Sequence, residues 1–545
     1  MNAKTHFIAA ILLSCALAGC GSGNQPVQTP RPIQITQGAA TAQSSLTLDV
    51  RAFGATADGK TKDTSAFQKA LDACADSGGT VIVPAGKYLI GSIQLHSGAT
   101  LVLQKDAVVT GSPDPADYPL VPVRFEGAMV KGHRALVYAQ DAHNVSIVGP
   151  GTLLGDNKIG NLRDPRGPVM VELVNCDNVI LDGFTDRYRR LWSVHLLFCR
   201  NVVARRLTIR TTLSNGDGID VDSSANVLIE NCDIDTGDDC ISLKSGRGIS
   251  AVRLARPTQD VVIANCSLAS DFAGVGIGSE MSGGIRNVHI ENCNFTAGVN
   301  AIYVKGRIGR GGFFENITGK NFDVATRVFL GLNLRDSGII GSDPVSGEEG
   351  LPHARNIAFS NVKVDVATLV DGARVPPGNS IDGLSLSNVT GICRRAITLA
   401  NAVNVNLSNV NVTGYTGAYL TTHNVTGTGL DGAVALRVPL LEDSDQLQIA
   451  FAKPPDDTRP MVRWWWFGPA VTKPQLQHQM EMMKQGGFGG FEVQPTYPLT
   501  LDGMIPGADN LKFLSPEFLD ALNFVAAKAK EMGLRMDLTL GSGWP

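Results

Sequence analysis

Residues 214–246 read SNGDGIDVDSSANVLIENCDIDTGDDCISLKSG, and the rest of the chain is organised around this stretch. Asp217 precedes the adjacent acids Asp238 and Asp239 by about one coil of parallel strands, with the short apolar run 227–229 between them. Stacked coils lie about 4.8 Å apart, so the three carboxyl groups would form one cluster. Like charges that close push one carboxyl towards its protonated form. An acid and a base at neutral pH are what hydrolysis of a glycosidic bond requires.

A purely structural role for these acids is the alternative, because Asp and Asn are common turn residues. We expect only turn-forming roles for four other acids, Asp220, Asp222, Asp233 and Asp235. The Asp238–Asp239 pair fits that explanation less well, since adjacent carboxylates beside an apolar strand repel each other.

A short pattern close to Asn-Val-x-Ile recurs along the chain and predicts the architecture. It occurs at Asn144, Asn178, Asn201, Asn226, Asp260, Asn287, Asn316, Asn356 and Asn404, with a degenerate copy at Asp382. Repeating short strands without intervening helices indicate a solenoid. We therefore predict an all-β fold, a right-handed parallel β-helix. Residues 64–74 (TSAFQKALDAC) predict a capped amphipathic helix that covers its N-terminal opening.

The N-terminus has the pattern of a bacterial lipoprotein. Lys4 precedes an apolar run that ends in Leu17-Ala18-Gly19-Cys20, so we expect a signal peptide over residues 1–20 and lipid on Cys20. A flexible tether over residues 21–45 follows. This predicts export and membrane attachment through the lipid, in the outer membrane or periplasm of a Gram-negative bacterium. An ordinary secretory signal is the alternative.

Composition narrows the function classes. The 545 residues carry a net charge of −4 and no basic patch, which disfavours nucleic-acid binding. Five of the ten cysteines, Cys176, Cys199, Cys232, Cys266 and Cys293, recur at equivalent repeat positions. We expect a ladder of buried reduced thiols rather than disulfides. No cysteine–histidine cluster indicates zinc, and we expect no cofactor.

The chain resembles glycoside hydrolase family 28, the polygalacturonases and rhamnogalacturonan hydrolases, in several motifs that follow one another in the family's order. These motifs are NGDGID, TGDDCISLKSG, IGSEMSGG and KGRIGRGG. The resemblance covers roughly residues 46–430, within an expected domain over 46–432. It implies an inverting hydrolase in which Asp238 is the general acid and Asp217 and Asp239 hold and deprotonate the attacking water. It also implies substrate contacts from Lys305 and Asn215.

The chain departs from the family pattern at two positions. The histidine of the Gly-His-Gly motif falls at Ala273, and the arginine of the Arg-Ile-Lys motif is Tyr303. Phe272 and Tyr303 offer a stacking surface that suits a less charged sugar. The preferred polymer, homogalacturonan or rhamnogalacturonan, stays open.

Six arginines lie near Trp192 in the sequence. The cations are Arg187, Arg189, Arg190, Arg205, Arg206 and Arg210, which we expect mostly on solvated coil faces rather than in a groove. Trp192 is equally compatible with a sugar platform and a core residue.

The chain changes character after residue 432. We expect a linker over residues 433–460 and then alternating strands and helices, which indicate a parallel βαβ arrangement. The run RWWWFGPAVT with the later GLRMDLTLGSGWP resembles the start of glycoside hydrolase family 106, the α-L-rhamnosidases. Residues 461–545 are therefore expected to be a truncated β/α-barrel fragment.

The sequence thus predicts a monomeric glycoside hydrolase that cleaves galacturonosyl linkages in pectic polysaccharide, its only expected partner besides the membrane. A β-elimination lyase on the same scaffold and a non-catalytic pectin-binding protein are the alternatives.

Overall fold

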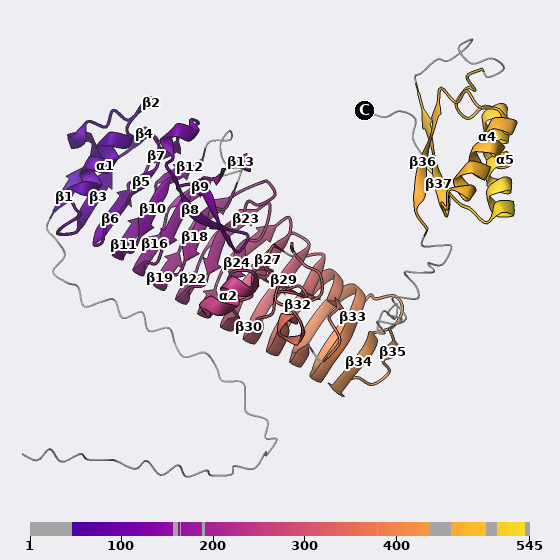
Figure 1. Cartoon of the computed structure of the whole chain (residues 1–545). Helices are drawn as coiled ribbons and strands as arrows, with labels where there is room; N and C mark the ends of the chain where they lie inside the picture. The colour runs from indigo at the N-terminus through magenta and orange to yellow at the C-terminus, as the bar shows by residue number, and fades with distance from the viewer. Residues whose placement is uncertain are drawn as a thin grey trace, which may run out of the picture. The chain divides into compact units, whose positions relative to one another are not determined.

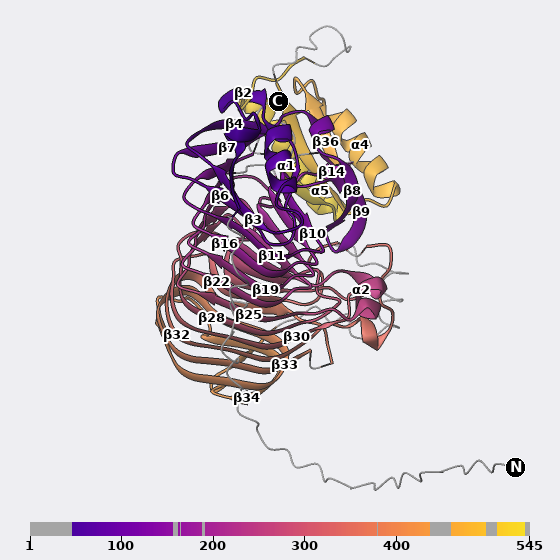
Figure 2. The same ribbon diagram turned by 90° about the vertical axis from the view of Figure 1, so that its left-hand side faces the viewer.

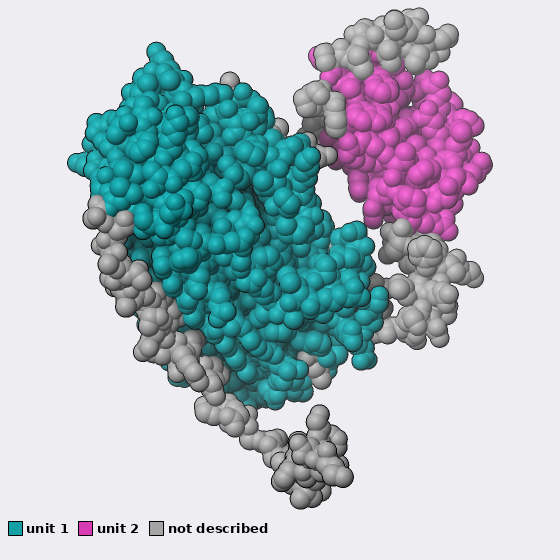
Figure 3. Space-filling view, turned by 60° about the vertical axis from the view of Figure 1, so that its left-hand side comes forward, with its two compact units in different colours: residues 1–437 teal, residues 438–545 magenta. Residues whose placement is uncertain are grey.

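The computed structural model describes residues 46–155, 162–163, 165–187, 191–339, 341–378, 380–436, 459–497 and 509–539. The chain divides into two compact units, Met1–Arg437 and Val438–Pro545, which are coloured separately in Figure 3. The expected signal peptide, lipidated Cys20, tether, most of the expected linker, Arg189 and Arg190 lie outside the described residues.

The first unit is a parallel β-helix, as predicted. Within the described residues 31 strands join one sheet, and the coils stack from β1 to β34 (Figures 1 and 2). The first row of strands contains β1 (Thr47–Asp49), β3 (Gly79–Val83), β6 (Ala99–Leu103), β11 (His143–Val148), β16 (Asp177–Asp182), β19 (Arg200–Arg205), β22 (Ala225–Glu230), β25 (Thr258–Ala264), β28 (Ile285–Phe295) and β30 (Phe313–Val324).

Two further rows of strands complete the coils, and the second row ends at β26, beyond which the long strand β28 pairs with both β25 and β26. The second row contains β2 (Asp58–Lys62), β4 (Gly86–Ile90), β7 (Ala107–Gly111), β12 (Thr152–Leu154), β17 (Thr185–Arg187), β20 (Thr208–Arg210), β23 (Asp233–Thr236) and β26 (Ser267–Ser270). The third row contains β5 (Ile93–Gln94), β10 (Val137–Gln140), β15 (Val171–Val174), β18 (Val194–Leu197), β21 (Ile219–Asp222), β24 (Ile241–Lys244), β27 (Ala273–Gly278), β29 (Asn300–Lys305) and β31 (Val328–Asn333). The candidate site lies on this third row.

The last coils are built from longer strands, and a small sheet lies outside the coils. The long strands are β32 (His353–Arg374), β33 (Ile381–Thr413) and β34 (Leu420–Thr428), followed by β35 (Val434–Ala435). The second sheet contains β8 (Leu120–Phe125), β9 (Ala128–His133), β13 (Leu162–Arg163) and β14 (Arg166–Gly167). Short helical elements are α2 (Gly248–Leu254), η1 (Val50–Phe53), η2 (Pro115–Asp117) and η3 (Glu348–Gly350).

The recurring asparagine marks a corner where the backbone is left-handed. Asn226, Asn287 and Asn316 have φ between 55° and 59°, a conformation that Asn tolerates better than most residues. Their side chains also hydrogen-bond from coil to coil: Asn316 Nδ2 donates to Asn287 Oδ1 at 3.0 Å. The sequence pattern therefore reflects one repeated backbone requirement.

A second asparagine ladder escaped the sequence analysis. Its members share a positive φ, and each one after Asn265 donates from its side-chain amide to the member in the preceding coil; they are Asn265, Asn292, Asn321, Asn361, Asn388 and Asn409. Asn265 follows β25, whereas the others lie inside the longer strands β28, β30, β32 and β33, and no apolar signature as clear as Val-x-Ile accompanies them.

The interior of the coils is apolar, with alternating strand residues buried. The five repeat cysteines are buried and free, as are Cys74, Cys240 and Cys393, so the predicted reduced thiols are confirmed among the described residues. The N-terminal helix α1 (Thr64–Asp72) buries Phe67, Ala70 and Leu71 as expected. It lacks the predicted side-chain cap, because Asp63 accepts the Thr56 and Ala57 backbone N–H groups instead.

The second unit shows the predicted βαβ order. Strands β36 (Met461–Phe467), β37 (Gly490–Thr496) and β38 (Arg535–Leu538) pair in parallel, and α4 (Lys473–Gln485) and α5 (Pro516–Met532) connect them. Trp466, Phe491 and Phe518 are buried between sheet and helices.

Candidate active site

The register of the third row decides which acids stack. Ile219 of β21 pairs with Ile241 of β24, so one coil here advances 22 residues (241 − 219). Asp217 therefore occupies the position of Asp239 in the preceding coil, and the Gly218 N–H donates to the Asp239 carbonyl at 3.0 Å. The predicted vertical meeting of Asp217 with the Asp238–Asp239 pair is present, with Asp239 as the direct neighbour.

The three acids differ in exposure. Asp217 and Asp239 are 3% and 1% exposed, whereas Asp238 is half-buried. Asp238 Oδ2 accepts the Asn215 backbone N–H at 3.0 Å, and its carbonyl accepts the Thr236 and Ser270 hydroxyls at 2.6 and 2.5 Å. Asp238 is therefore the acid of this cluster that can reach a glycosidic oxygen arriving from solvent.

Lys244 forms ion pairs with two buried acids, Asp217 and Asp220, and was missed in the sequence analysis. Its Nζ lies 3.0 Å from Asp217 Oδ2 and 2.6 Å from Asp220 Oδ1, and 3.9 Å from the centre of the Trp192 ring. Burial raises the pKa of Asp217 well above its ordinary value, with Lys244 opposing and the neighbouring acids adding to the rise. One ammonium beside two buried carboxyl groups favours a state in which the two acids share a proton.

The expectation that Asp220 and Asp222 only form turns is wrong. Both lie within β21 and are fully buried, Asp220 beside Lys244 and Asp222 beside His195 and Arg124. Asp233 and Asp235 also lie in a strand, β23, but they are exposed. Spacing alone did not separate the two pairs.

Lys305 lies inside the acid cluster. Its Nζ is 2.7 Å from Asp239 Oδ2, which also accepts the Ser242 hydroxyl at 2.9 Å. Burial raises the pKa of Asp239, and Lys305 opposes this rise. Lys305 is 8% exposed and its Nζ also lies 4.7 Å from the centre of the Phe272 ring, so it borders the surface where a substrate would lie.

A second buried ion network continues on the N-terminal side. His195 Nδ1 lies 2.9 Å from Glu172 Oε1, and its Nε2 lies 3.7 Å from Asp222 Oδ2. Arg124 Nη1 lies 3.4 Å from Asp222 Oδ1. Burial lowers the pKa of His195, but its interactions with the carboxylates of Asp222 and Glu172 outweigh burial and raise the pKa to about 9. The imidazole is thus held as a cation.

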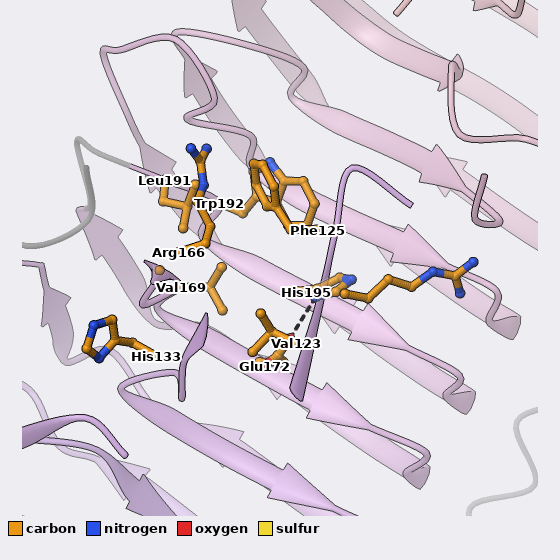
Figure 4. A pocket seen from close by; sticks show the side chains of 11 residues that line it. Val123, Phe125, His133, Arg166, Val169, Glu172, Leu191, Trp192 and His195 are labelled. Atoms are coloured by element: carbon orange, nitrogen blue, oxygen red, sulfur yellow. Dashed lines mark hydrogen bonds and ion pairs between the residues drawn. The ribbon is translucent and has the colours of Figure 1, made fainter. Parts of the chain in front are cut away.

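A pocket with aromatic walls borders this network, and Glu172 and His195 are among the residues that line it (Figure 4). The rings of Phe125 and Trp192 stack with centres 4.9 Å apart, and the Arg166 guanidinium lies 3.8 Å from the centre of the Phe125 ring. Arg166 Nη2 also donates to Asn215 Oδ1 at 3.2 Å. Asn215 therefore joins this pocket to Asp238. Trp192 is 3% exposed and serves as a buried wall of the site.

The described arginines of the cluster, Arg187, Arg205, Arg206 and Arg210, lie on solvated coil faces, as expected. Arg205 and Arg206 pair with Asp182 at 2.9 and 2.6 Å, and Arg210 pairs with exposed Asp233. Phe272 and Tyr303 meet edge to face, with ring centres 5.7 Å apart. Ala273 is buried, so that position contributes no polar group.

Comparison with known families agrees with this geometry. The family model described as glycosyl hydrolases family 28 matches residues 76–430. The chain belongs to this family. The motif that carries the three acids thus lies within the matched region, and the protein is a glycoside hydrolase.

Individual relatives share the same region. A probable polygalacturonase from Vitis vinifera is 30% identical over 360 residues, which cover 62% of this chain and 72% of that protein. An exo-poly-α-D-galacturonosidase from Dickeya chrysanthemi is 27% identical over 328 residues, covering 50% and 54% of the two chains. The crystal structure of an exopolygalacturonase from Thermotoga maritima aligns with a TM-score of 0.57 and 26% identity, covering 70% of this chain and 92% of that one.

Two shorter matches flank or overlap the main one. A rhamnogalacturonase A/epimerase, pectate lyase-like model matches residues 47–103, and an α-L-rhamnosidase model matches residues 452–545. Among the described helices, none is long and apolar enough to cross a membrane.

Proposed function

We propose that the β-helix hydrolyses galacturonosyl linkages in pectic polysaccharide with inversion at the anomeric carbon. The observation that carries this proposal is the stacking of Asp217 on Asp239 with the more exposed Asp238 beside them. The polygalacturonase relatives and the exopolygalacturonase structure support the choice of sugar.

Each acid has a role that fits its surroundings. Asp238, which reaches solvent, protonates the leaving oxygen, while Asp217 and Asp239 hold and deprotonate the attacking water. Lys244 and Lys305 keep a positive charge beside these two buried acids, so that a carboxylate form remains accessible for the base.

The direct test is product analysis of the full chain on homogalacturonan and on rhamnogalacturonan. Release of saturated reducing ends from either polymer is expected. Products with a double bond would instead identify a lyase, and binding of both polymers without any cleavage would identify a binding protein.

The second unit and the N-terminus extend the proposal. The α-L-rhamnosidase match over residues 452–545 supports a rhamnose-related role for the second unit, which points to rhamnogalacturonan as the polymer. No catalytic residue is assigned there.

The LAGC motif supports lipid attachment at Cys20 and a place in the outer membrane or periplasm. Mass spectrometry of the N-terminal peptide from the exported chain tests this, and an unmodified Cys20 would contradict it.

A further inference from the structure

A pocket of about 300 Å³ lies on the third row, on the C-terminal side of the acids. Its lining includes Phe272, Tyr303, Asn333, Arg327, Arg374 and Arg395. Within the described residues these arginines form no ion pair with the acids of the cluster, and they belong to three successive coils.

The pocket is continuous with the acid cluster. Ile241 of β24 pairs with Val275 of β27, and the same offset of 34 residues (275 − 241) places Phe272 one coil beyond Asp238. The Lys305 ammonium contacts both sides, at 2.7 Å from Asp239 and 4.7 Å from the Phe272 ring centre. A sugar chain leaving the acids in this direction would cross the Phe272–Tyr303 surface next.

Positive charge dominates the pocket. Arg327, Arg374 and Arg395 are exposed, while Asp371 is the only carboxylate among the described residues that line it. Arg374 lies 3.4 Å from Asp336, and both side chains are well exposed, at 67% and 44%. Such a pair is weak and leaves the guanidinium available to another anion.

The aromatic surface is held in place at the pocket edge. Asn333 is 8% exposed and its Nδ2 donates to Asp336 Oδ1 at 3.0 Å and to the Tyr303 hydroxyl at 3.4 Å. Tyr303 is thereby oriented, and its ring and that of Phe272 offer apolar faces of the kind that pack against sugars. The site therefore changes from apolar near the acids to cationic further away.

We propose that this arginine pocket is a subsite for the carboxylate of a uronate unit, and that the sugar between it and the acids rests on Phe272 and Tyr303. Guanidinium groups suit this role because they bind carboxylates through paired hydrogen bonds. Arg327 precedes β31, three coils beyond Asp238, which corresponds to roughly 14 Å along the axis. The subsite rests on the proposed function and adds to it a preference for chains long enough to reach the pocket.

Binding of oligogalacturonates to the full chain carrying Asp238→Asn tests the subsite, because this change is expected to slow cleavage about 10²- to 10⁴-fold during the titration. Adding Arg327→Gln and Arg374→Gln together is expected to weaken hexagalacturonate binding about fivefold to tenfold, since exposed ion pairs contribute modestly. Digalacturonate binding should change by less than about twofold, because the shorter chain does not reach the pocket.

Arg355→Gln is the matched control. Arg355 belongs to the same strand as Arg374, β32. It is 62% exposed and pairs with Glu315 at 3.8 Å, but it does not line the pocket. It should leave both affinities unchanged. Unaltered hexagalacturonate affinity in the double variant, or equal weakening for both ligands, would overturn the subsite. Cleavage by the chain without these substitutions decides the proposed function separately.

Discussion

The two sides of the acid cluster use the same strand row in opposite ways. On the N-terminal side Glu172, His195 and Asp222 are buried and paired with one another. On the C-terminal side the cations of the pocket, such as Arg327 and Arg374, are exposed, and Arg374 forms only an exposed pair with Asp336. Buried pairs fix geometry because losing one partner leaves an uncompensated charge, whereas exposed cations remain available to a ligand. Burial, rather than residue type, separates the structural ions from the binding ones.

Asp238 lies at the boundary between the two sides, and its loss should have the largest effect. Asp238→Asn removes the proton donor and should lower kcat about 10²- to 10⁴-fold without altering the unfolding transition. Reducing-end assays and circular dichroism measure the two quantities. Asp235→Asn, on the exposed face of the same coil, is the control and should retain activity. Full activity of Asp238→Asn would refute the acid assignment.

Lys244 tests the buried side. Lys244→Met leaves Asp217 and Asp220 buried without their cation, so the free energy of unfolding should fall by about 3–5 kcal/mol. Lys320→Met is the control, because Lys320 is 45% exposed and pairs with Glu291 at 3.1 Å at the surface. The control should change stability by less than about 1 kcal/mol. Equal effects in urea denaturation would show that burial does not distinguish the two pairs.

His195 makes part of the stability depend on pH. Its pKa is raised from 6.5 to about 9, so its contribution is complete below pH 6.5 and is lost as pH rises through about 9. The expected loss is about 3 kcal/mol. His195→Gln should be less stable at pH 6 and should show a smaller decline towards pH 9. Parallel stability curves for the two proteins, measured by urea denaturation, would contradict the assignment.

Added salt should produce the smallest effect, and it should weaken substrate binding at the exposed arginine pocket without affecting the buried ion pairs. Raising the ionic strength from about 0.05 to 0.5 M screens exposed charges but reaches buried pairs much less. The KM for long oligogalacturonates is therefore expected to rise about twofold to fivefold, while the unfolding free energy changes little. A KM independent of salt would mean that the exposed arginines do not contact the substrate.

The sequence was sufficient for the coils because one residue type carried one backbone requirement. Asn226, Asn287 and Asn316 mark corners with positive φ, and Asp217 and Asp239 are separated by one coil, as their spacing in the sequence predicts. These features are local or repeat at a regular interval, so a single sequence reveals them.

The partners of the acids were not predictable in the same way. Lys244 stands in the quoted motif, but its contact with Asp217 depends on side chains from different coils. The arginine pocket is harder still, because the register between β31 and β32 shifts between Gly331 and Asn333 and places Asn333 opposite Arg374. Counting residues from one coil to the next fails across such an irregularity.

The most direct test of the account follows the first products by proton NMR during cleavage of an α-linked galacturonan by the full chain. The stacked acids predict that the new reducing end appears first as the β-anomer and equilibrates later, because water attacks opposite the departing oxygen. Initial α-anomer, or a product with a ring double bond, would contradict the assignment of Asp217, Asp238 and Asp239.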